Sequence, residues 1–377
     1  MIRILLAAGG TGGHVFPAIA VAEQLKALGL KPVFITDRRG KPMIPTQFSA
    51  TKILAASPYG ATKGERITGL TKLACGALQT LTMMMIYRPK LVIGFGGYPA
   101  VAPVLVGKIL KRKTMLHEQN AYFGRANNFL ARYTDKIALS WDKTNNLSTM
   151  MRTKAEVMGM PVREAFHQIG TKGYQPPQED GAINILIVGG SLGARIFGET
   201  VPEALSRMPE DLRQRLNITH QVRAEQMAEV EAHYKRAGIK AVLAPFIKDM
   251  AEEMEKAHLV VCRSGASSVA ELAASGRPSI LVPFPDAMDD HQTANAKAMS
   301  DIGGGWVIPE EEMSAGSLAG KISTLITTPE KLTAAAITAK SLHQDHAARL
   351  IANEICKLAG VTPKADQAVI QERGHQS

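Results

Sequence analysis

The chain of 377 residues is poor in cysteine and in aromatic side chains. Its three cysteines, Cys75, Cys262 and Cys356, include no Cys-x-x-Cys pair and belong to no His/Cys cluster. This pattern argues against a structural zinc site and favours a reducing compartment. Phe, Trp and Tyr make up only 5% of the residues, so stacking platforms for the bases of a nucleic acid are scarce.

Long hydrophobic runs are also missing. Residues 91–107 carry no charge, but glycines and prolines interrupt their first part. That pattern is typical of a strand, a glycine loop and a helix start rather than of a membrane span. The first ten residues hold one arginine and a short apolar stretch that glycines break, so we expect no secretory signal there.

Charge is present but unevenly divided. The net charge is +10; residues 1–160 hold 22 Lys+Arg against 7 Asp+Glu, a net of +15, and residues 161–377 hold 22 against 27, a net of −5. A basic half indicates an acidic partner, which could be nucleic acid, anionic lipid or a substrate that bears phosphate. A basic surface without a partner is the alternative.

The length predicts two domains. In the first half, apolar strands alternate with helical patterns; we expect strands at residues 2–8, 31–37, 90–96, 113–119, 135–140 and 155–161. The polar, Pro- and Gly-containing stretch 170–182 is typical of a linker. The pattern then restarts, with strands expected from residue 183 and at residues 241–247, 258–265 and 278–285. Strands separated by helices predict parallel sheets.

The stretch AAGGTGGHVFPA follows the first expected strand and leads into a helix that we expect at residues 16–29. A strand, a glycine loop and a helix start together make an anion site, because backbone N–H groups and the helix dipole point outward. A dinucleotide fingerprint is the alternative: Gly10 and Gly12 fit it and Asp37 stands where a ribose-binding acid would, but Val15 replaces the third glycine. His14 is bulky for such a loop.

The second half offers further anion sites, at Ser191 in VGGSLGAR and at Ser264–Gly265 in CRSGASSVAEL. Glu271 follows in the second turn of that expected helix, where a carboxylate can accept two hydrogen bonds from a ribose diol. An anion-binding helix start beside such a carboxylate indicates nucleotide recognition. An ordinary capped helix with a solvated glutamate remains the alternative.

Acidic and amide side chains then gather in PFPDAMDDHQTANA, residues 283–296. Asp289, Asp290, His291, Gln292 and Asn295 suit sugar hydroxyls, because carboxylates and amides form paired hydrogen bonds with them. A metal site is the alternative, but no Asp-x-Asp motif on a strand accompanies these acids.

These motifs together resemble the MurG family of bacterial transferases, glycosyltransferase family 28. The matching stretches run in order from residue 9 to residue 296: GGTGGHVFPA, GFGGYPA, HEQNA, PVR, GGSLGA, RSGASSVAEL and DDHQTANA. The resemblance implies a GT-B fold, with two Rossmann-like parallel-sheet α/β domains facing across a cleft. The expected parts are an N-terminal acceptor and membrane-facing domain (1–162), a C-terminal domain that binds UDP-N-acetylglucosamine (163–345), a helix packing back on the first domain (346–360) and a polar tail (361–377).

The resemblance also implies the binding residues. Thr11, Gly12, Gly13 and Asn120 would line the N-terminal side of the donor site. The C-terminal side would hold the nucleotide and sugar through Arg163, Ser191, Ile247, Ser264, Gly265, Ala266, Ser267, Ser268, Glu271 and Gln292. Two positions depart from the family pattern: Met160 stands where many relatives carry Asn, and His291 replaces one of two paired glutamines.

The activity that the resemblance implies is inverting transfer of N-acetylglucosamine from UDP-N-acetylglucosamine to the 4-hydroxyl of the N-acetylmuramoyl group of lipid I, giving lipid II for peptidoglycan synthesis. His14 is the predicted general base, because an unperturbed histidine accepts a proton near neutral pH; Glu118 is the reserve, and an anion-binding His14 is the alternative. Helix starts would meet the diphosphate charge, so we expect neither a metal nor a cofactor.

A lipid acceptor requires contact with a membrane. The basic cluster 108–113 and the apolar stretch 70–86 are predicted to meet the anionic cytoplasmic leaflet, as in a peripheral protein of the inner membrane; a core helix is the alternative for residues 70–86. Nucleic acid is not an expected partner. The competing activities are another GT-B UDP-sugar transferase, an epimerase of related architecture and a nicotinamide-dependent oxidoreductase.

Overall fold

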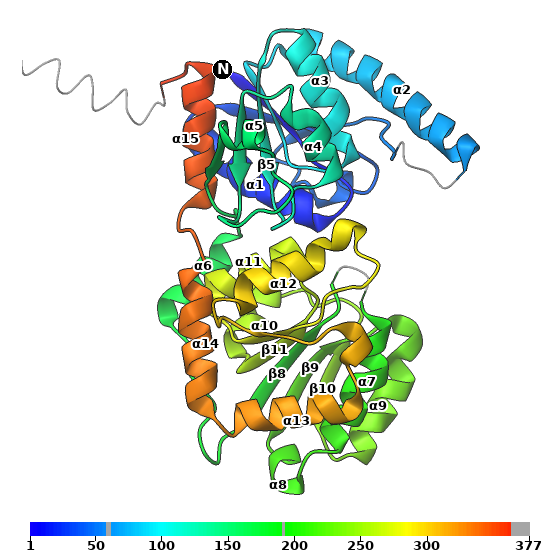
Figure 1. Cartoon of the computed structure of the whole chain (residues 1–377), viewed down its shortest axis with the longest axis vertical. Coiled ribbons are helices and arrows are strands. Elements are labelled where there is room, and N and C mark those ends of the chain that lie inside the picture. The colour runs from blue at the N-terminus through cyan, green and yellow to red at the C-terminus, as the bar shows by residue number, and fades with distance from the viewer. Residues whose placement is uncertain (58–61, 191–192, 363–377) are drawn as a thin grey trace, which may run out of the picture. The chain divides into compact units, whose positions relative to one another are not determined.

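In the computed structural model, which describes residues 1–57, 62–190 and 193–362, the chain forms two compact units. Unit 1 comprises residues 1–162 together with the segment from residue 344 onward, and unit 2 comprises residues 163–343. Each unit is built around one parallel β-sheet covered by helices (Figure 1).

The sheet of unit 1 has seven strands in the order β3-β2-β1-β4-β5-β6-β7. Apolar and β-branched residues dominate its central strands, whose side chains are buried on both faces, as parallel strands require. The strands are β1 (Arg3–Ala7), β2 (Lys31–Thr36), β3 (Ser49–Lys52), β4 (Leu91–Gly94), β5 (Lys113–Glu118), β6 (Lys136–Leu139) and β7 (Ala155–Val157).

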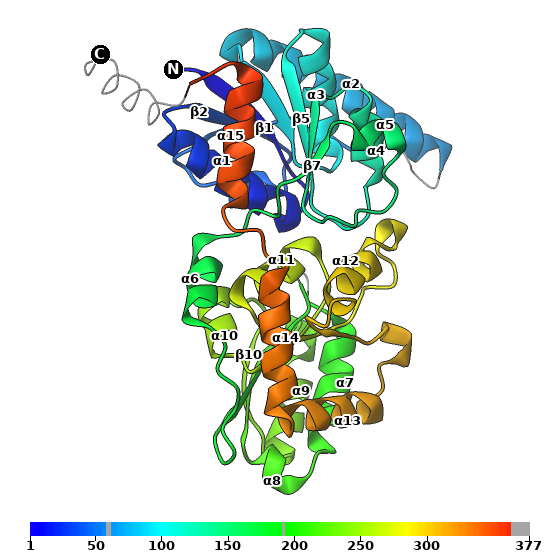
Figure 2. The same cartoon turned by 60° about the vertical axis from the view of Figure 1, so that its left-hand side comes forward.

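Helices cover both faces of this sheet. One face packs against α1 and α15, which lie side by side (Figure 2), and the other packs against α2, α3, α4 and α5. Ile4 and Leu6 point to the first face and Leu5 to the second, since successive side chains of a strand alternate. The helices are α1 (Gly12–Ala27), η1 (Lys41–Met43), α2 (Lys63–Tyr87), η2 (Tyr98–Ala100), α3 (Val101–Ile109), α4 (Arg125–Ala131), α5 (Thr149–Arg152) and α15 (Ala347–Ala359).

The sheet of unit 2 has six strands in the order β10-β9-β8-β11-β12-β13, which repeats the order of the first six strands of unit 1. The strands are β8 (Ile183–Val188), β9 (Leu216–Gln221), β10 (Lys240–Ala244), β11 (Leu259–Cys262), β12 (Ser279–Leu281) and β13 (Trp306–Val307). Their main core packs against α7, α9 and α13, with Phe197 and Tyr234 among its largest wholly buried side chains.

The helices of unit 2 complete its two outer layers. They are α6 (Glu164–Lys172), α7 (Arg195–Ser206), α8 (Glu210–Arg213), η3 (Ala224–Gln226), α9 (Met227–Arg236), α10 (Met250–Lys256), α11 (Ala266–Ser275), η4 (Met288–Asp290), α12 (His291–Ser300), η5 (Glu310–Glu312), α13 (Ala315–Ile326) and α14 (Pro329–Ser341). Ligands of such sheets bind beyond the carboxyl ends of the strands, which defines where a site is to be sought in each unit.

Two expectations from the sequence need correction. The stretch 170–182 does not link the units: it lies inside unit 2, where the Tyr174 hydroxyl donates a hydrogen bond to the backbone oxygen of His258 at 2.8 Å. The strands β3, β9 and β13 were not expected; β3 and β13 are short, and polar residues alternate along β9.

Candidate active site

The glycine loop after β1 is held by a carboxylate at the end of β2. Asp37 Oδ1 accepts hydrogen bonds from the backbone N–H groups of Gly10, at 3.0 Å, and Gly40, at 2.8 Å. Burial alone would raise the pKa of Asp37, but these two donors and Arg39 hold it below its usual value. Because Asp37 is committed to the loop, it does not serve as the ribose-binding acid of a dinucleotide fold.

Helix α1 begins inside the glycine motif, earlier than expected. Thr11 is its N-cap residue and makes no side-chain capping bond, and Gly12, Gly13 and His14 form the first turn. Helix geometry leaves the N–H groups of a first turn without intrahelical partners, so those of Gly12 and Gly13 are donors for an anion.

The His14 ring lies against the second glycine motif of unit 1. Gly96 and Gly97 have positive φ angles of +82° and +70°, and a Cβ atom on either would lie 3.1 Å and 3.4 Å, respectively, from the nearest atom of the His14 ring. On its Nδ1 side, the ring lies 3.2 Å from Oε1 of Gln119. The positive φ angles favour glycine at both positions, and at Gly96 the close approach of the imidazole leaves little space for a side chain.

Glu118, the reserve base, is saturated with hydrogen bonds. Its Oε1 accepts from the backbone N–H of Asn120 at 3.0 Å and from the amide of that side chain at 3.2 Å. Its Oε2 accepts from the N–H of Gly124 at 3.0 Å and from the amide of Asn127 at 2.8 Å. Glu118 is 2% exposed, and its hydrogen bonds organise the loop that carries Asn120.

In unit 2 the start of α11 is tied to the start of α12. The Ser264 hydroxyl is buried and donates to the backbone oxygen of Gln292 at 2.8 Å, while the Asn295 amide donates to the backbone oxygen of Ser264 at 3.1 Å. Gln292 Oε1 accepts from the N–H of Phe284 at 3.0 Å, which aligns the amide. Ser264 therefore supports the helix start with its side chain.

The first turn of α11 contains Ala266, Ser267 and Ser268, and Gly265 is its N-cap without a side-chain capping bond. The three N–H groups of that turn are suited to a phosphate. The Ser267 hydroxyl oxygen is buried and has no hydrogen-bond partner among the described residues. Ile247 lies in the loop between β10 and α10 and is 8% exposed.

Arg263, between β11 and α11, was not singled out from the sequence. Its guanidinium is buried, donates to the backbone oxygens of Val282 at 3.2 Å and Pro283 at 3.1 Å, and pairs with Glu310. It also lies between two phenyl rings whose centroids are 5.2 and 5.3 Å away. Arg263 thus connects the carboxyl ends of β11 and β12 through these hydrogen bonds. A single arginine in a motif gives no sequence signal for such a structural role.

Arg163 and Glu271, both expected to contact the nucleotide, contact each other. Arg163 Nη2 lies 2.8 Å from Glu271 Oε1, and its guanidinium stacks over Phe166 at 4.7 Å from the ring centroid. Burial raises the pKa of Glu271, although Arg163 opposes the shift. The carboxylate is therefore aligned by a cation and can accept a diol at its remaining lone pairs.

The described glycines after β8 lie close to neighbouring backbone. A Cβ on Gly189 would lie 2.1 Å from the backbone nitrogen of Ala194. Gln221, at the end of β9, accepts from the N–H of Gly189 at 3.1 Å and donates to the backbone oxygen of Gly190 at 2.8 Å. Ser191, where an anion site was expected, lies outside the described residues, and α7 begins after Ala194.

The acidic segment before α12 has a strained backbone. Asp289 and Asp290 have φ angles of +56° and +51°, in the left-handed region that is costly for residues other than glycine. His291 Nδ1 lies 2.6 Å from the backbone oxygen of Met288, to which it donates. His291 is thus bonded within its own turn, whereas the neighbouring Gln292 faces the strand ends.

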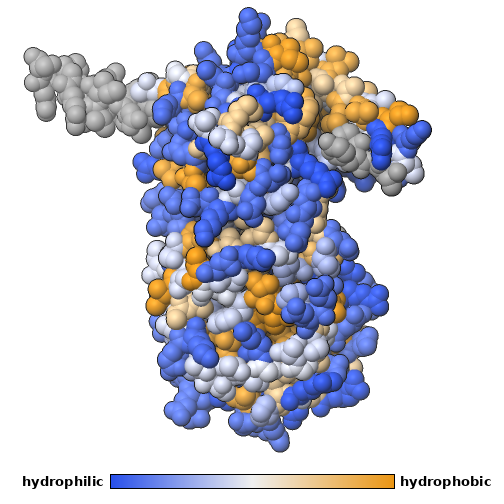
Figure 3. Space-filling model, viewed as in Figure 1, coloured by the Kyte–Doolittle hydropathy of each residue, from blue (hydrophilic) through white to orange (hydrophobic). Residues whose placement is uncertain are grey.

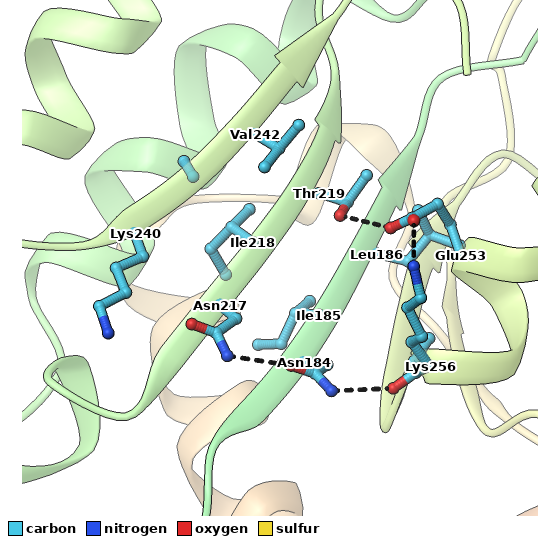
Figure 4. Close-up of a pocket in the computed structure, with 12 residues that line it drawn as sticks. Asn184, Ile185, Leu186, Asn217, Ile218, Thr219, Lys240, Val242, Glu253 and Lys256 are labelled. Atoms are coloured by element: carbon cyan, nitrogen blue, oxygen red, sulfur yellow. Dashed lines mark hydrogen bonds and ion pairs between the residues drawn. The ribbon is translucent and has the colours of Figure 1, made fainter. Parts of the chain in front are cut away.

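A separate hollow of about 380 Å³ lies on the sheet of unit 2 (Figure 4). It is bordered by the amino-terminal parts of β8, β9 and β10 and by α10, and the amide of Asn217 and the hydroxyl of Thr219 are hydrogen-bonded to Asn184 and Glu253. No residue expected to bind substrate lines it. Because ligands of parallel sheets bind at the carboxyl ends, the hollow is not the expected substrate site.

Two Rossmann-like parallel-sheet units, each with a helix start at the carboxyl ends of its strands, define the GT-B class of glycosyltransferase. The chain belongs to glycosyltransferase family 28: the family's N-terminal domain matches residues 4–139 and its C-terminal domain matches residues 184–353. The resemblance carried by the motifs is thereby confirmed.

Several relatives of 39 to 44% identity bear one description, UDP-N-acetylglucosamine--N-acetylmuramyl-(pentapeptide) pyrophosphoryl-undecaprenol N-acetylglucosamine transferase. The chain is 42% identical over 363 residues to that of Rhodospirillum centenum, covering 96% of each chain, and 44% identical over 353 residues to that of Granulibacter bethesdensis, covering 92% and 91%. The crystal structure of Acinetobacter baumannii MurG superposes with a TM-score of 0.77 at 31% identity, covering 95% of this chain and all of that one.

Proposed function

We propose that this chain transfers N-acetylglucosamine from UDP-N-acetylglucosamine to lipid I, giving lipid II. The observation that carries the proposal is 42% identity over 96% of both chains to a transferase with that description. The other UDP-sugar activities, including epimerisation, are not favoured, because the relatives at this identity share one description.

In this proposal unit 2 holds the donor. The N–H groups of Ala266, Ser267 and Ser268 meet the diphosphate, and Glu271, aligned by Arg163, accepts the ribose hydroxyls. Charge developing on the departing UDP is stabilised by donors that are already in position.

Unit 1 supplies the base. His14 Nε2 takes the proton of the acceptor 4-hydroxyl while that oxygen forms a bond to the anomeric carbon. The bond from this carbon to the UDP oxygen breaks, and UDP leaves with the electron pair. One displacement inverts the anomeric configuration, so no covalent enzyme intermediate is required. Gly12 and Gly13 offer N–H groups to an acceptor or donor phosphate.

Membrane docking by unit 1 is the second part of the proposal. Among the described helices, none combines the length and the apolar character needed to cross a bilayer. α2 instead exposes large apolar side chains beside basic ones (Figure 3): Ile67, Leu70, Leu78, Met85 and Ile86 are each 57 to 66% exposed. Only four residues of α2 are buried, which favours an interfacial helix over a core helix.

Docking can be tested with vesicles of an anionic lipid. Replacing the basic cluster by Gln should weaken binding at low salt by about 1 kcal/mol per residue close to the surface, with less from Lys108 because it pairs with Asp135 at 3.2 Å. Lys108, Lys111, Arg112 and Lys113 are changed together. An equal set on unit 2 serves as control: Lys235, Arg236, Lys240 and Lys248. Equal binding by both variants would refute docking through the cluster.

The activity is tested with radiolabelled UDP-N-acetylglucosamine and lipid I in detergent. Label should enter a lipid product only when lipid I is present. Release of an epimerised sugar nucleotide without an acceptor, or transfer to soluble sugars but not to lipid I, would contradict the proposal.

A further inference from the structure

The strongest unexplained cluster in unit 1 is a line of three polar side chains, His14, Gln119 and His117, that runs from the candidate base into the core. We propose that Gln119 and His117 are positioning residues that hold His14 in the tautomer with hydrogen on Nδ1 and the lone pair on Nε2. The inference rests on the proposed function, in which His14 Nε2 receives the acceptor's proton.

The first anchor of the line is the backbone oxygen of Gly159. His117 Nε2 lies 3.1 Å from it, and a carbonyl oxygen can only accept, so Nε2 of His117 carries the hydrogen. Ser140 agrees with this assignment, because its hydroxyl donates to the backbone oxygen of Glu118 at 2.8 Å and turns its own oxygen, 3.4 Å away, to His117 Nε2. Burial lowers the pKa of His117 to about 4, so the ring is neutral at pH 7 and Nδ1 bears a lone pair.

The second anchor is the backbone oxygen of His117. Gln119 Nε2 lies 3.2 Å from that oxygen and 2.9 Å from Nδ1 of the same histidine. Both are acceptors, so this end of the side chain is the NH₂ group. The opposite end, Oε1, therefore faces His14.

The consequence at His14 follows from the same rule. Gln119 Oε1 can only accept, and it lies 3.2 Å from His14 Nδ1, so Nδ1 carries the hydrogen. In a neutral imidazole the other nitrogen then bears the lone pair. Neutral histidine in water prefers the opposite tautomer, with hydrogen on Nε2, so the line of hydrogen bonds selects the form in which Nε2 is a base.

Burial makes the selection effective. His117 is wholly buried and Gln119 is 1% exposed, so a reversed amide would leave unpaired groups where water does not replace them. Gly96 and Gly97 confine the imidazole from the other side. Because the partner of Nδ1 is an uncharged amide, the line orients His14 without adding a negative charge that would favour its protonated form.

The tautomer can be read directly by long-range ¹H–¹⁵N spectroscopy of protein labelled with ¹⁵N-histidine. His14 is assigned by the loss of its signals in His14→Gln. We expect hydrogen on Nδ1 in the native protein and a shift toward hydrogen on Nε2 in Gln119→Ala. The turnover number of Gln119→Ala should fall by about 10- to 100-fold, less than for loss of the base, with KM for UDP-N-acetylglucosamine unchanged.

Two further variants separate positioning from damage to the fold. Gln119→Glu keeps an acceptor for Nδ1–H, and its protonated carboxyl can donate to His117 Nδ1, so at low pH it should restore the native tautomer. Once it ionises, its second oxygen faces two acceptors of His117, so the native tautomer and the turnover should be lost as the pH rises. Asn127→Ala removes a neighbouring buried amide, which is bonded to Glu118 and to the His117 backbone, and should leave the His14 tautomer unchanged.

The outcomes distinguish the two proposals. Hydrogen on Nε2 of His14 in the native protein, or a native tautomer in Gln119→Ala, would overturn the positioning role. If the tautomer behaves as expected but His14→Gln keeps most of the activity, then the line of side chains stands and the role of His14 as base is wrong.

Discussion

Units 1 and 2 share the order of their first six strands but differ in the groups at the carboxyl ends of those strands. In unit 1, the side chain of His14 is hydrogen-bonded to the amide of Gln119, which in turn is hydrogen-bonded to the buried neutral ring of His117. In unit 2, buried Arg263 pairs with Glu310 and Arg163 pairs with Glu271. In the proposed function, the same scaffold supports proton transfer in one unit and anion recognition in the other, because function depends on the site and not on the fold.

A change at His14 should give the largest effect and should separate proton transfer by unit 1 from nucleotide binding by unit 2. His14→Ala is expected to reduce the turnover number by about 100- to 10,000-fold, the range for a general base. It should leave UDP affinity nearly unchanged, since in the proposed function unit 2 holds the nucleotide. Timed activity assays measure the turnover number, and calorimetric titration measures the affinity for UDP. His233→Ala, on α9 of unit 2, is the control. A variant that loses UDP affinity instead would place His14 in donor binding.

Acid should destabilise both units through one buried histidine in each. Burial lowers the pKa of His117 to about 4 and that of His220 to about 3. Since the unfolded chain takes up these protons near pH 6.5, the stability that each neutral ring contributes is present above that pH. It is lost as pH falls toward the folded value, at up to about 1.4 kcal/mol per pH unit for each proton.

The two tryptophans can assign this loss to a unit, because Trp141 lies in unit 1 and Trp306 in unit 2. Urea unfolding followed through each one, in variants that retain only that tryptophan, should show destabilisation between pH 6.5 and 4. His220→Asn should flatten the profile of unit 2 alone. An unchanged slope in that variant would assign the acid sensitivity to other groups.

Glu271→Ala tests the anion-recognising unit. Loss of a charged hydrogen bond to the ribose should weaken UDP binding by about 1.5–3 kcal/mol. Glu253→Ala is a matched control, because Glu253 is an acid of the same unit that lines the hollow on the sheet. An equal loss of affinity in both variants would indicate that the charge of unit 2, and not the position of Glu271, governs binding.

The smallest effect is expected from adding one methyl group beside His14, in Gly96→Ala. Gly96→Ala should cost about 1–3 kcal/mol of stability through its positive φ and should also displace the His14 ring, lowering the turnover number. Gly303 has a similar φ angle of +86°, but a Cβ atom there would meet open space. Gly303→Ala should therefore lower the stability without lowering the turnover number. Urea unfolding and kinetics of both variants separate strain from contact with His14.

Much of the fold follows from local sequence patterns, and less of the site does. Glycine motifs after apolar strands predicted the two parallel sheets and the helix start of α11. The beginning of α1 was misplaced because glycine is a poor helix former, yet Gly12 and Gly13 lie in its first turn. Short or alternating strands such as β3 and β9 gave too weak a signal.

The supporting residues of the site were not predictable in the same way. Gln119 and Arg263 stand in motifs beside residues that were singled out, but their roles depend on partners far along the chain, Gln119 on His14 and Arg263 on Pro283. The Pro- and Gly-rich composition of residues 170–182 is equally compatible with a linker or a loop within a unit. Only tertiary packing decides between them.

The discontinuity of unit 1 has a consequence for synthesis on the ribosome. Residues 163–343 are inserted between its sheet and α15, so unit 2 is translated in full before α15 exists. Ile351 and Ile355 of α15 are wholly buried in the core shared with α1. Until α15 emerges, the nascent chain exposes the apolar face of α1 and of the sheet of unit 1. We expect the need for chaperone protection to end when α15 packs against this face.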